Sequence, residues 1–142
     1  MRIVCDTNVI VSGMLFGGHS RDILTAVAQG RVEAFTTPAL LHELREVLLR
    51  RKFRLSLEQV DAAMELLRES FLCVNPDETL SVIADDPDDD RVLEAALASR
   101  ARVIVSGDNH LLSLRVWRTI TVFSPADFVA SCFKRSSACR YR

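Results

Sequence analysis

The sequence predicts an α/β fold with three layers, α/β/α, built on a mostly parallel central sheet. Two short runs rich in β-branched residues, at 2–5 and 103–105, lack the polar and apolar alternation of a half-exposed strand. Between the strand-like runs lie segments whose apolar residues recur at helical spacing, as at 40–48. Strands that alternate with helices favour parallel pairing, with helices covering both faces of the sheet.

One domain is expected over 1–133, followed by a basic tail at 134–142. The 142 residues are enough to bury a substantial core, and no linker or internal repeat divides them. A hydrophobic content of 49% and a charged content of 26% are ordinary for a globular domain. The tail is poor in apolar residues, so we expect it to fray.

Several protein classes are disfavoured by the sequence. No apolar run reaches the roughly 18–20 residues of a membrane span, and the N-terminus lacks the pattern of a signal peptide. Cys5, Cys73, Cys132 and Cys139 are scattered without CxxC spacing, which argues against a zinc site. We therefore expect a cytoplasmic protein with reduced thiols and no membrane association, with Cys5 and Cys73 buried in strands.

The first third of the chain predicts two strands separated by a helix. The strand at 2–5 is followed by residues 9–16, which stay apolar until Gly17-Gly18. Ser20 is the expected N-cap of a helix that buries Ile23 and ends at Gly30, and residues 32–36 form the second strand.

Two helices with clear start signals follow. Thr37 is the expected cap of a helix with Pro38 at its first position, and this helix runs into the basic residues 50–52. Glu43 falls at the border of its apolar stripe. Ser56 and Gln59 form a capping box that opens a helix to about residue 70, before a strand at 71–74.

The second half repeats the alternation. An acidic run at 85–90 leads into a helix. From Asp89 onward the apolar residues of this segment fall at helical spacing: Val92, Leu93, Ala96 and Leu97. The strand at 103–105 exits through Ser106 and Gly107 to Asp108. A short helix at 110–114, a strand at 120–123 and a last helix from Ser124-Pro125 to about 133 complete the prediction.

Four carboxylates are predicted to meet at one edge of the sheet. Asp6 and Asp108 follow the ends of strands, while Asp89 and Glu43 lie near the starts of helices. The carboxyl ends of parallel strands and the helix starts that follow them face the same edge. An all-oxygen site selects Mg²⁺ or Mn²⁺ over zinc. Such a metal, with open positions for water and phosphate, is suited to phosphodiester hydrolysis.

Three segments, in this order, carry a resemblance to a known family: IVCDTNVIVSGM, PALLHELREVL and DPDDDRVLEAALASRARVIVSGDNHLL. From Arg2 to about Phe133 the chain resembles the PIN-domain nucleases, specifically the VapC-like toxins of bacterial toxin–antitoxin pairs. Each motif alone is weak, but their order and spacing together are specific.

The resemblance implies a set of site residues. Asp6, Glu43, Asp89 and Asp108 would be the catalytic, metal-binding acids, with Asn8, Ser12 and Ser106 as polar supports. In the family the third acid lies seven residues before a small helix residue. Counting back from Ala96 gives Asp89, with Asp90 as the alternative. His110 departs from the pattern, because many relatives carry an aspartate there, so one metal or two remains open.

The resemblance also implies an activity and partners. It implies a Mg²⁺- or Mn²⁺-dependent endoribonuclease, the toxin of a toxin–antitoxin pair, with a small antitoxin that covers the site. It further implies a homodimer or higher homo-oligomer, for which the apolar residues 9–16 and the early helices offer candidate surface.

Simpler interpretations stand beside these. Asp6 and Asn8 can form an Asx turn, Asp108 can be a helix cap, and Glu43 can be a solvent-facing helix residue. Asp85, Asp86 and Asp88 are better explained as a solvated loop and helix start than as ligands.

The net charge of −1 is a sum over an uneven distribution, which includes a basic run at 50–54. By default it is a solvated helix end, and its functional alternative is contact with RNA phosphates. His110 also has two interpretations: a surface or capping residue, or a residue that contacts an RNA phosphate. These candidate substrate-binding residues are Arg50, Arg51, Lys52, Arg54 and His110. One Trp and one Tyr give little sign of a base-stacking surface.

Two rival functions are considered. A catalytically inactive PIN-like module that acts through a protein partner would not need four clustered carboxylates. A phosphatase with an aspartyl nucleophile commonly has a second aspartate two residues on, where this chain has Asn8.

Overall fold

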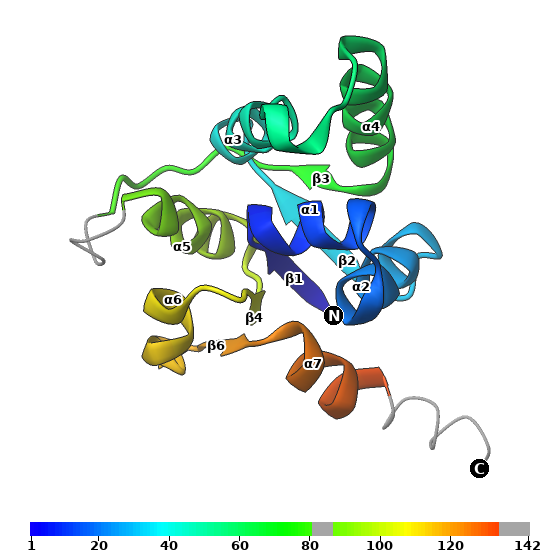
Figure 1. The fold of residues 1–142 in the computed structure, drawn as a ribbon. Helices are drawn as coiled ribbons and strands as arrows, with labels where there is room; N and C mark the ends of the chain where they lie inside the picture. The colour runs from blue at the N-terminus through cyan, green and yellow to red at the C-terminus, as the bar shows by residue number, and fades with distance from the viewer. Residues whose placement is uncertain (81–86, 134–142) are drawn as a thin grey trace.

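The computed structural model describes residues 1–80 and 87–133, and the side chains of this part except those of 87 and 88. A six-stranded sheet in the order β3-β2-β1-β4-β6-β5 lies at its centre (Figure 1). All neighbouring strands are parallel except β5 and β6. The strands are β1 (Arg2–Cys5), β2 (Glu33–Thr36), β3 (Leu72–Cys73), β4 (Val103–Val105), β5 (Val116–Trp117) and β6 (Ile120–Phe123).

Helices cover both faces, which confirms the three-layer prediction. Alternate residues of β1 separate the two cores: Ile3 and Cys5 pack into one, and Val4 into the other. The first core is covered mainly by α1 (Thr7–Leu15), α2 (Gly18–Ala28), α3 (Pro38–Leu48), α4 (Leu57–Ser70) and α7 (Pro125–Phe128). The second is covered by α5 (Pro87–Ser99) and α6 (Asn109–Leu114). No helix in the described ranges is long and apolar enough to cross a membrane.

The apolar run after β1 is the helix α1, which packs beside α2 (Figure 1). Val9, Ile10 and Val11 are buried in the protein's own core. They do not provide the association surface that the apolar run suggested.

The predicted start of α2 is wrong by three residues, because the N-cap is Gly17 and not Ser20. Gly17 caps the helix with φ of 94°, and Gly18 is its first residue with φ of 69°. These left-handed values suit glycine, so the turn begins earlier than the expected cap. Ser20 lies inside the helix and is buried.

The next two helices begin as predicted. The Thr37 hydroxyl accepts a hydrogen bond from the Leu40 N–H at 3.2 Å, and the Ser56–Gln59 capping box is complete. The C-terminal boundary of α3 differs, because the helix ends at Leu48. The basic run continues into a 3₁₀ turn, η1 (Arg51–Phe53), which connects α3 to α4.

The second half follows the prediction with two exceptions. The short strand β5 was not predicted, and the last helix continues from α7 into a π-helical turn, η2 (Val129–Phe133). Cys5 is buried as expected, whereas Cys73 is exposed because β3 is a two-residue edge strand. The expectations for Asp85, Asp86, Cys139 and the tail fall on residues outside the described part.

Strand order fixes where a site can form. The chain passes from β1 to β2 and β3 on one side, then returns to β4 and β6 on the other. The order therefore reverses between β1 and β4, which pair in parallel. The crevice beyond the carboxyl ends of such a strand pair is the usual ligand site of an open α/β sheet.

Candidate metal centre

Asp6 and Asp108 lie at the reversal point, held together by Ser106. The Asp6 N–H donates to the Val105 carbonyl at 2.9 Å, which joins the ends of β1 and β4. The Ser106 hydroxyl donates to Asp6 Oδ2 at 2.7 Å and accepts from the Asp108 N–H at 2.9 Å. One fully buried serine thus links two acids that are distant in sequence.

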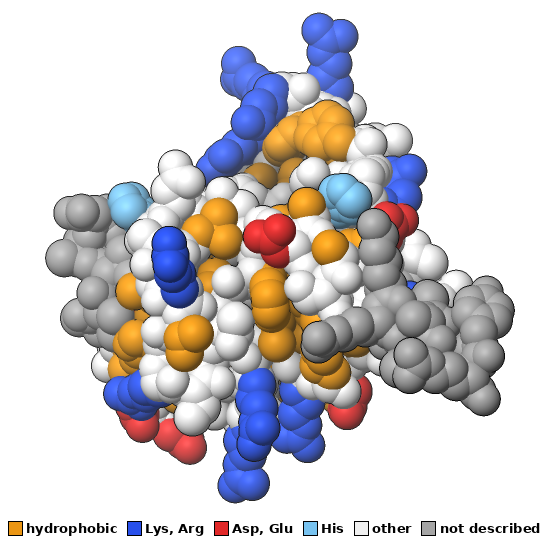
Figure 2. Space-filling model, turned by 90° about the horizontal axis from the view of Figure 1, so that it is seen from below, with side chains coloured by type: hydrophobic (Ala, Val, Ile, Leu, Met, Phe, Trp, Pro, Cys, Tyr) orange, Lys and Arg blue, Asp and Glu red, His pale blue; other side chains and the backbone are white. Residues whose placement is uncertain are grey.

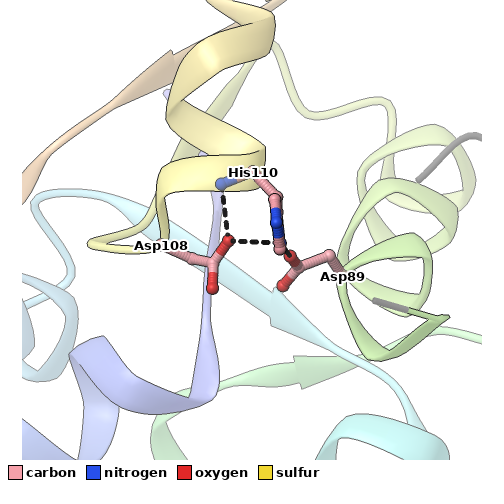
Figure 3. A group of neighbouring side chains, drawn as sticks. All are labelled: Asp89, Asp108 and His110. Carbon is pink, nitrogen blue, oxygen red and sulfur yellow. Dashed lines mark hydrogen bonds and ion pairs between the residues drawn. The ribbon is translucent and has the colours of Figure 1, made fainter. Parts of the chain in front are cut away.

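A second group of side chains surrounds Asp108. Ligand atoms of Asp89, Asp108 and His110 all lie within 4.8 Å of one another. Figure 3 shows Asp89 reaching in from α5, with the His110 ring against both carboxylates. The His110 Nδ1 lies 3.8 Å from Asp89 Oδ2 and 3.6 Å from Asp108 Oδ1. Asp89, and not the similarly buried Asp90, belongs to this group in the described part of the chain.

Glu43 approaches from α3, beside the start of α1. The Thr7 hydroxyl donates to Glu43 Oε2 at 2.9 Å, and Thr7 directly follows Asp6. The Glu43 carboxylate is therefore oriented toward the start of α1, and it is not simply a solvent-facing helix residue.

The electrostatic environment of Asp6 is unfavourable to its own charge. Its side chain is only 5% exposed. Burial raises the pKa of Asp6 above its usual value, and the Asp108 carboxylate raises it further. The Ser106 hydrogen bond and the nearby Thr7 and Asn8 N–H groups oppose the increase. Such a carboxylate is stabilised as an anion when a cation binds beside it.

The donor set fits a hard divalent cation. Asp89 and Asp108 offer carboxylate oxygens within 4.8 Å of each other, and Asp6 is linked to Asp108 through Ser106. Glu43 accepts from Thr7, the residue that follows Asp6. A set dominated by carboxylates favours Mg²⁺ or Mn²⁺. His110 adds an imidazole nitrogen, a ligand that Mn²⁺ accepts more readily than Mg²⁺.

The remaining predicted residues are not members of the group formed by Asp89, Asp108 and His110. Asn8 and Ser12 line a groove along α1 together with Lys52. Arg50, Arg51 and Arg54 flank Lys52 and are exposed. Figure 2 shows one face of the molecule, on which Lys and Arg side chains gather in separate groups bordering exposed hydrophobic side chains.

Sequence reasoning missed the position of the His110 ring. The signal was present, because Asp108 caps α6 by accepting from the His110 N–H at 2.8 Å. A residue two positions after such a cap is held in the first helical turn, close to the capping carboxylate. The support from Thr7 was also missed, since a threonine at a helix start has many other partners.

Known structures of low sequence identity share this fold. The chain is similar to VapBC2 from Rickettsia felis, solved bound to a DNA fragment from its promoter, with a TM-score of 0.62 at 13% identity. That match covers 87% of this chain and 98% of the other. The chain is also similar to the T. brucei RRP44 PIN domain, with a TM-score of 0.56 at 16% identity, and that match covers 98% of this chain and 86% of the other.

A third similar structure is FitAcB from Neisseria gonorrhoeae, with a TM-score of 0.52 at 17% identity, covering 87% of this chain and 98% of that one. No curated protein matches the chain in sequence. The family model described as "PIN domain" matches residues 2–110, which include all four predicted acids. The chain therefore belongs to the PIN domain family.

Proposed function

We propose that this protein is a Mg²⁺- or Mn²⁺-dependent endoribonuclease that acts as the toxin of a toxin–antitoxin pair. The observation that supports this most directly is the link from Asp6 through Ser106 to Asp108, with Asp89 beside it. A non-catalytic module has no need for several carboxylates gathered at one edge of the sheet, where they repel one another.

Each residue of the centre has a proposed role. Asp6, Asp89 and Asp108 would hold the cation, and Ser106 fixes the orientation of the Asp6 carboxylate. When bound, the cation supplies Lewis acidity and makes its water hydroxide-like. Glu43, oriented by Thr7, completes the set or positions the attacking water. His110 is half-exposed at the centre, where its imidazole would either bind the cation or donate to a phosphate oxygen.

The partners are also proposed. Two of the similar structures are named VapBC2 and FitAcB, which supports an antitoxin as partner for this cytoplasmic toxin. A neighbouring gene that encodes a small protein with a DNA-binding N-terminal segment would support the proposed toxin–antitoxin pair. Light scattering of the purified protein tests the proposed homodimer or higher oligomer.

Asp6→Asn is the variant that tests the activity. It should abolish metal-dependent cleavage of single-stranded RNA, because a carboxylate ligand is lost, while the fold stays intact. Removing one of several like charges should leave stability unchanged or raise it. The measurement is RNA cleavage with Mg²⁺ or Mn²⁺ and with chelator, alongside circular dichroism.

The matched control is Asp22→Asn, which removes an exposed carboxylate of α2 that is not among the candidate site residues. It should cleave like wild type. Equal cleavage by Asp6→Asn and wild type would refute the mechanism. Absence of wild-type cleavage with either metal would favour the inactive binding module.

A further inference from the structure

A groove runs along α1 from Asn8 to the connector between α3 and α4. Its volume is about 560 Å³, within the range of small-molecule sites. Asn8, two residues after Asp6, lines one end, and Ser12 follows one turn later. Phe16 at the end of α1 and Lys52 and Phe53 of η1 line the other.

The far end of the groove carries an aromatic pair. Phe16 is 72% exposed, and its ring centroid lies 6.3 Å from that of Phe53, with the rings tilted by 56°. Phe53 is partly buried and packs against the core, so it supports Phe16 from below. A phenylalanine left this exposed gains from an apolar or aromatic surface placed on its free face.

The aromatic pair lies among cations. The Lys52 ammonium is 5.1 Å from the centroid of the Phe53 ring. Arg50, Arg51, Lys52 and Arg54 are all exposed, and none forms an ion pair with a carboxylate in the described part of the chain. Aromatic faces combined with unneutralised cations match single-stranded nucleic acid, which offers bases and phosphates side by side.

The spacing connects this end to the metal centre. From Asn8 to Phe16 the helix rises roughly 12 Å, at about 1.5 Å per residue. Between Asn8 and Phe16 the groove is lined by the polar Ser12 and the apolar Val11 and Leu15. An extended strand with a phosphate at the acids can therefore continue along α1 and bring a neighbouring base to Phe16.

We propose that this groove is a nucleobase subsite: a base flanking the cleaved bond stacks on Phe16, and Lys52 binds an adjacent phosphate. The inference rests on the proposed ribonuclease function and adds the residues that position its substrate. Asn8 lies nearest the acids and can hydrogen-bond a base edge or sugar. A protein partner's apolar side chain is the competing occupant, but it gains nothing from the unpaired cations.

The first experiment measures binding without catalysis. A short fluorescein-labelled single-stranded RNA of mixed sequence is titrated with protein in chelator, and its anisotropy is followed. Phe16→Leu keeps an apolar side chain but removes the stacking face, and should weaken binding on the order of 5- to 100-fold. Phe16→Trp should bind at least as well as wild type.

Matched controls separate stacking from general surface effects. Leu66→Ala removes another exposed apolar side chain, 62% exposed on α4, and should not change binding. Lys52→Gln should weaken binding and reduce its salt dependence, while Lys52→Arg should retain both. Wild-type binding by Phe16→Leu would overturn the subsite and assign the groove to a protein partner.

The second experiment uses cleavage and a modified substrate. Phe16→Leu should raise KM for RNA while kcat stays the same, because Phe16 touches no acid of the centre. A second substrate series places an abasic ribose in turn on either side of the cleaved bond. At one of these positions wild type and Phe16→Leu should have the same KM, because the base that stacks on Phe16 is absent. A Phe16→Leu defect that persists at every abasic position would refute stacking.

The two failures are distinguishable. Metal-dependent cleavage that is insensitive to Phe16 would refute the subsite and leave the nuclease function standing. Phe16-dependent RNA binding in a protein that cleaves nothing would support the subsite and refute the nuclease.

Discussion

At the scale of single residues, Asp6 and Ser106 explain how a buried cluster of acids is tolerated. Ser106 uses its one proton on Asp6 and its lone pair on the Asp108 N–H, so both contacts are satisfied by one hydroxyl. The Asp6 carboxylate still pays a desolvation penalty, which is why its pKa is raised. The site is thus built for a cation at the expense of the metal-free protein's stability.

This predicts a pH dependence of the metal-free protein. The unfolded chain releases the Asp6 proton near the ordinary value of 3.8, whereas the folded protein keeps it to higher pH. Between the two pKa values the folded state holds more protons, so stability falls as pH rises, by up to about 1.4 kcal/mol per pH unit. Urea unfolding in the presence of chelator, repeated over a series of pH values, measures this change in the free energy of unfolding.

In Asp6→Asn the pH dependence of stability that comes from the Asp6 carboxyl disappears. The variant should lose less stability than wild type as pH rises from about 4, since it cannot ionise. Identical pH profiles for the two proteins would show that Asp6 keeps an ordinary pKa in the folded state.

The residues of the centre were partly readable from sequence. Asp6 and Asp108 were predictable because an acid just beyond a buried strand must lie at the sheet's edge. The Ser106 bridge and the His110 ring were not, because they depend on distances of a few Å that no spacing rule fixes. Phe16 and Phe53 could not be identified from the sequence, because only the folded structure reveals which phenylalanines stay exposed.

At the scale of elements, the cap signals at Thr37 and Ser56 were reliable, whereas Ser20 was the wrong cap for α2 and the apolar run at 9–16 did not predict α1. Thr37 and Ser56 mark helix starts because their hydroxyls bond N–H groups that are otherwise unsatisfied. The run at 9–16 gave no such periodicity, since α1 is buried between the sheet and α2. The strand β5 has two residues, too few to establish any pattern.

Gly13 tests how closely α1 and α2 must approach. A Cβ there would lie 2.7 Å from Leu24 Cδ1 and 2.8 Å from the Ser20 carbonyl oxygen. The carbonyl belongs to the backbone of α2 and cannot rotate away. Gly13→Ala should therefore lower the free energy of unfolding by about 1–2 kcal/mol, since overpacking outweighs the gain in helix propensity.

Gly107→Ala is the matched control in urea unfolding. A Cβ at Gly107 meets nothing within 4 Å, and its φ lies outside the left-handed region. Its stability should stay within about 0.5 kcal/mol of wild type. A Gly13→Ala protein as stable as wild type would mean that the two helices can separate freely.

At the scale of the whole molecule, strand order brings four segments to one point. Asp6 follows β1, Asp108 follows β4, and Asp89 and Glu43 arrive on α5 and α3. A cation bound there would connect segments from both halves of the chain. Metal binding should then stabilise the fold globally, because the unfolded chain has no such site.

Mn²⁺ should raise the melting temperature of wild type. At a metal concentration of about 100 times Kd the stabilisation is about 2.7 kcal/mol, or roughly 5–10 °C for a domain of this size. Asp6→Asn/Asp108→Asn should show neither this shift nor heat of Mn²⁺ binding in calorimetry, while Asp22→Asn should show both. A shift retained by the double variant would place the metal elsewhere.

The two margins of the sheet have a consequence for self-association. One side ends at β3 and the other at β5, each with two residues. Strands this short present few unpaired backbone groups, so another chain gains little by extending the sheet sideways. We therefore expect any stable assembly of this protein to use side-chain contacts and not pairing at the margins of the sheet.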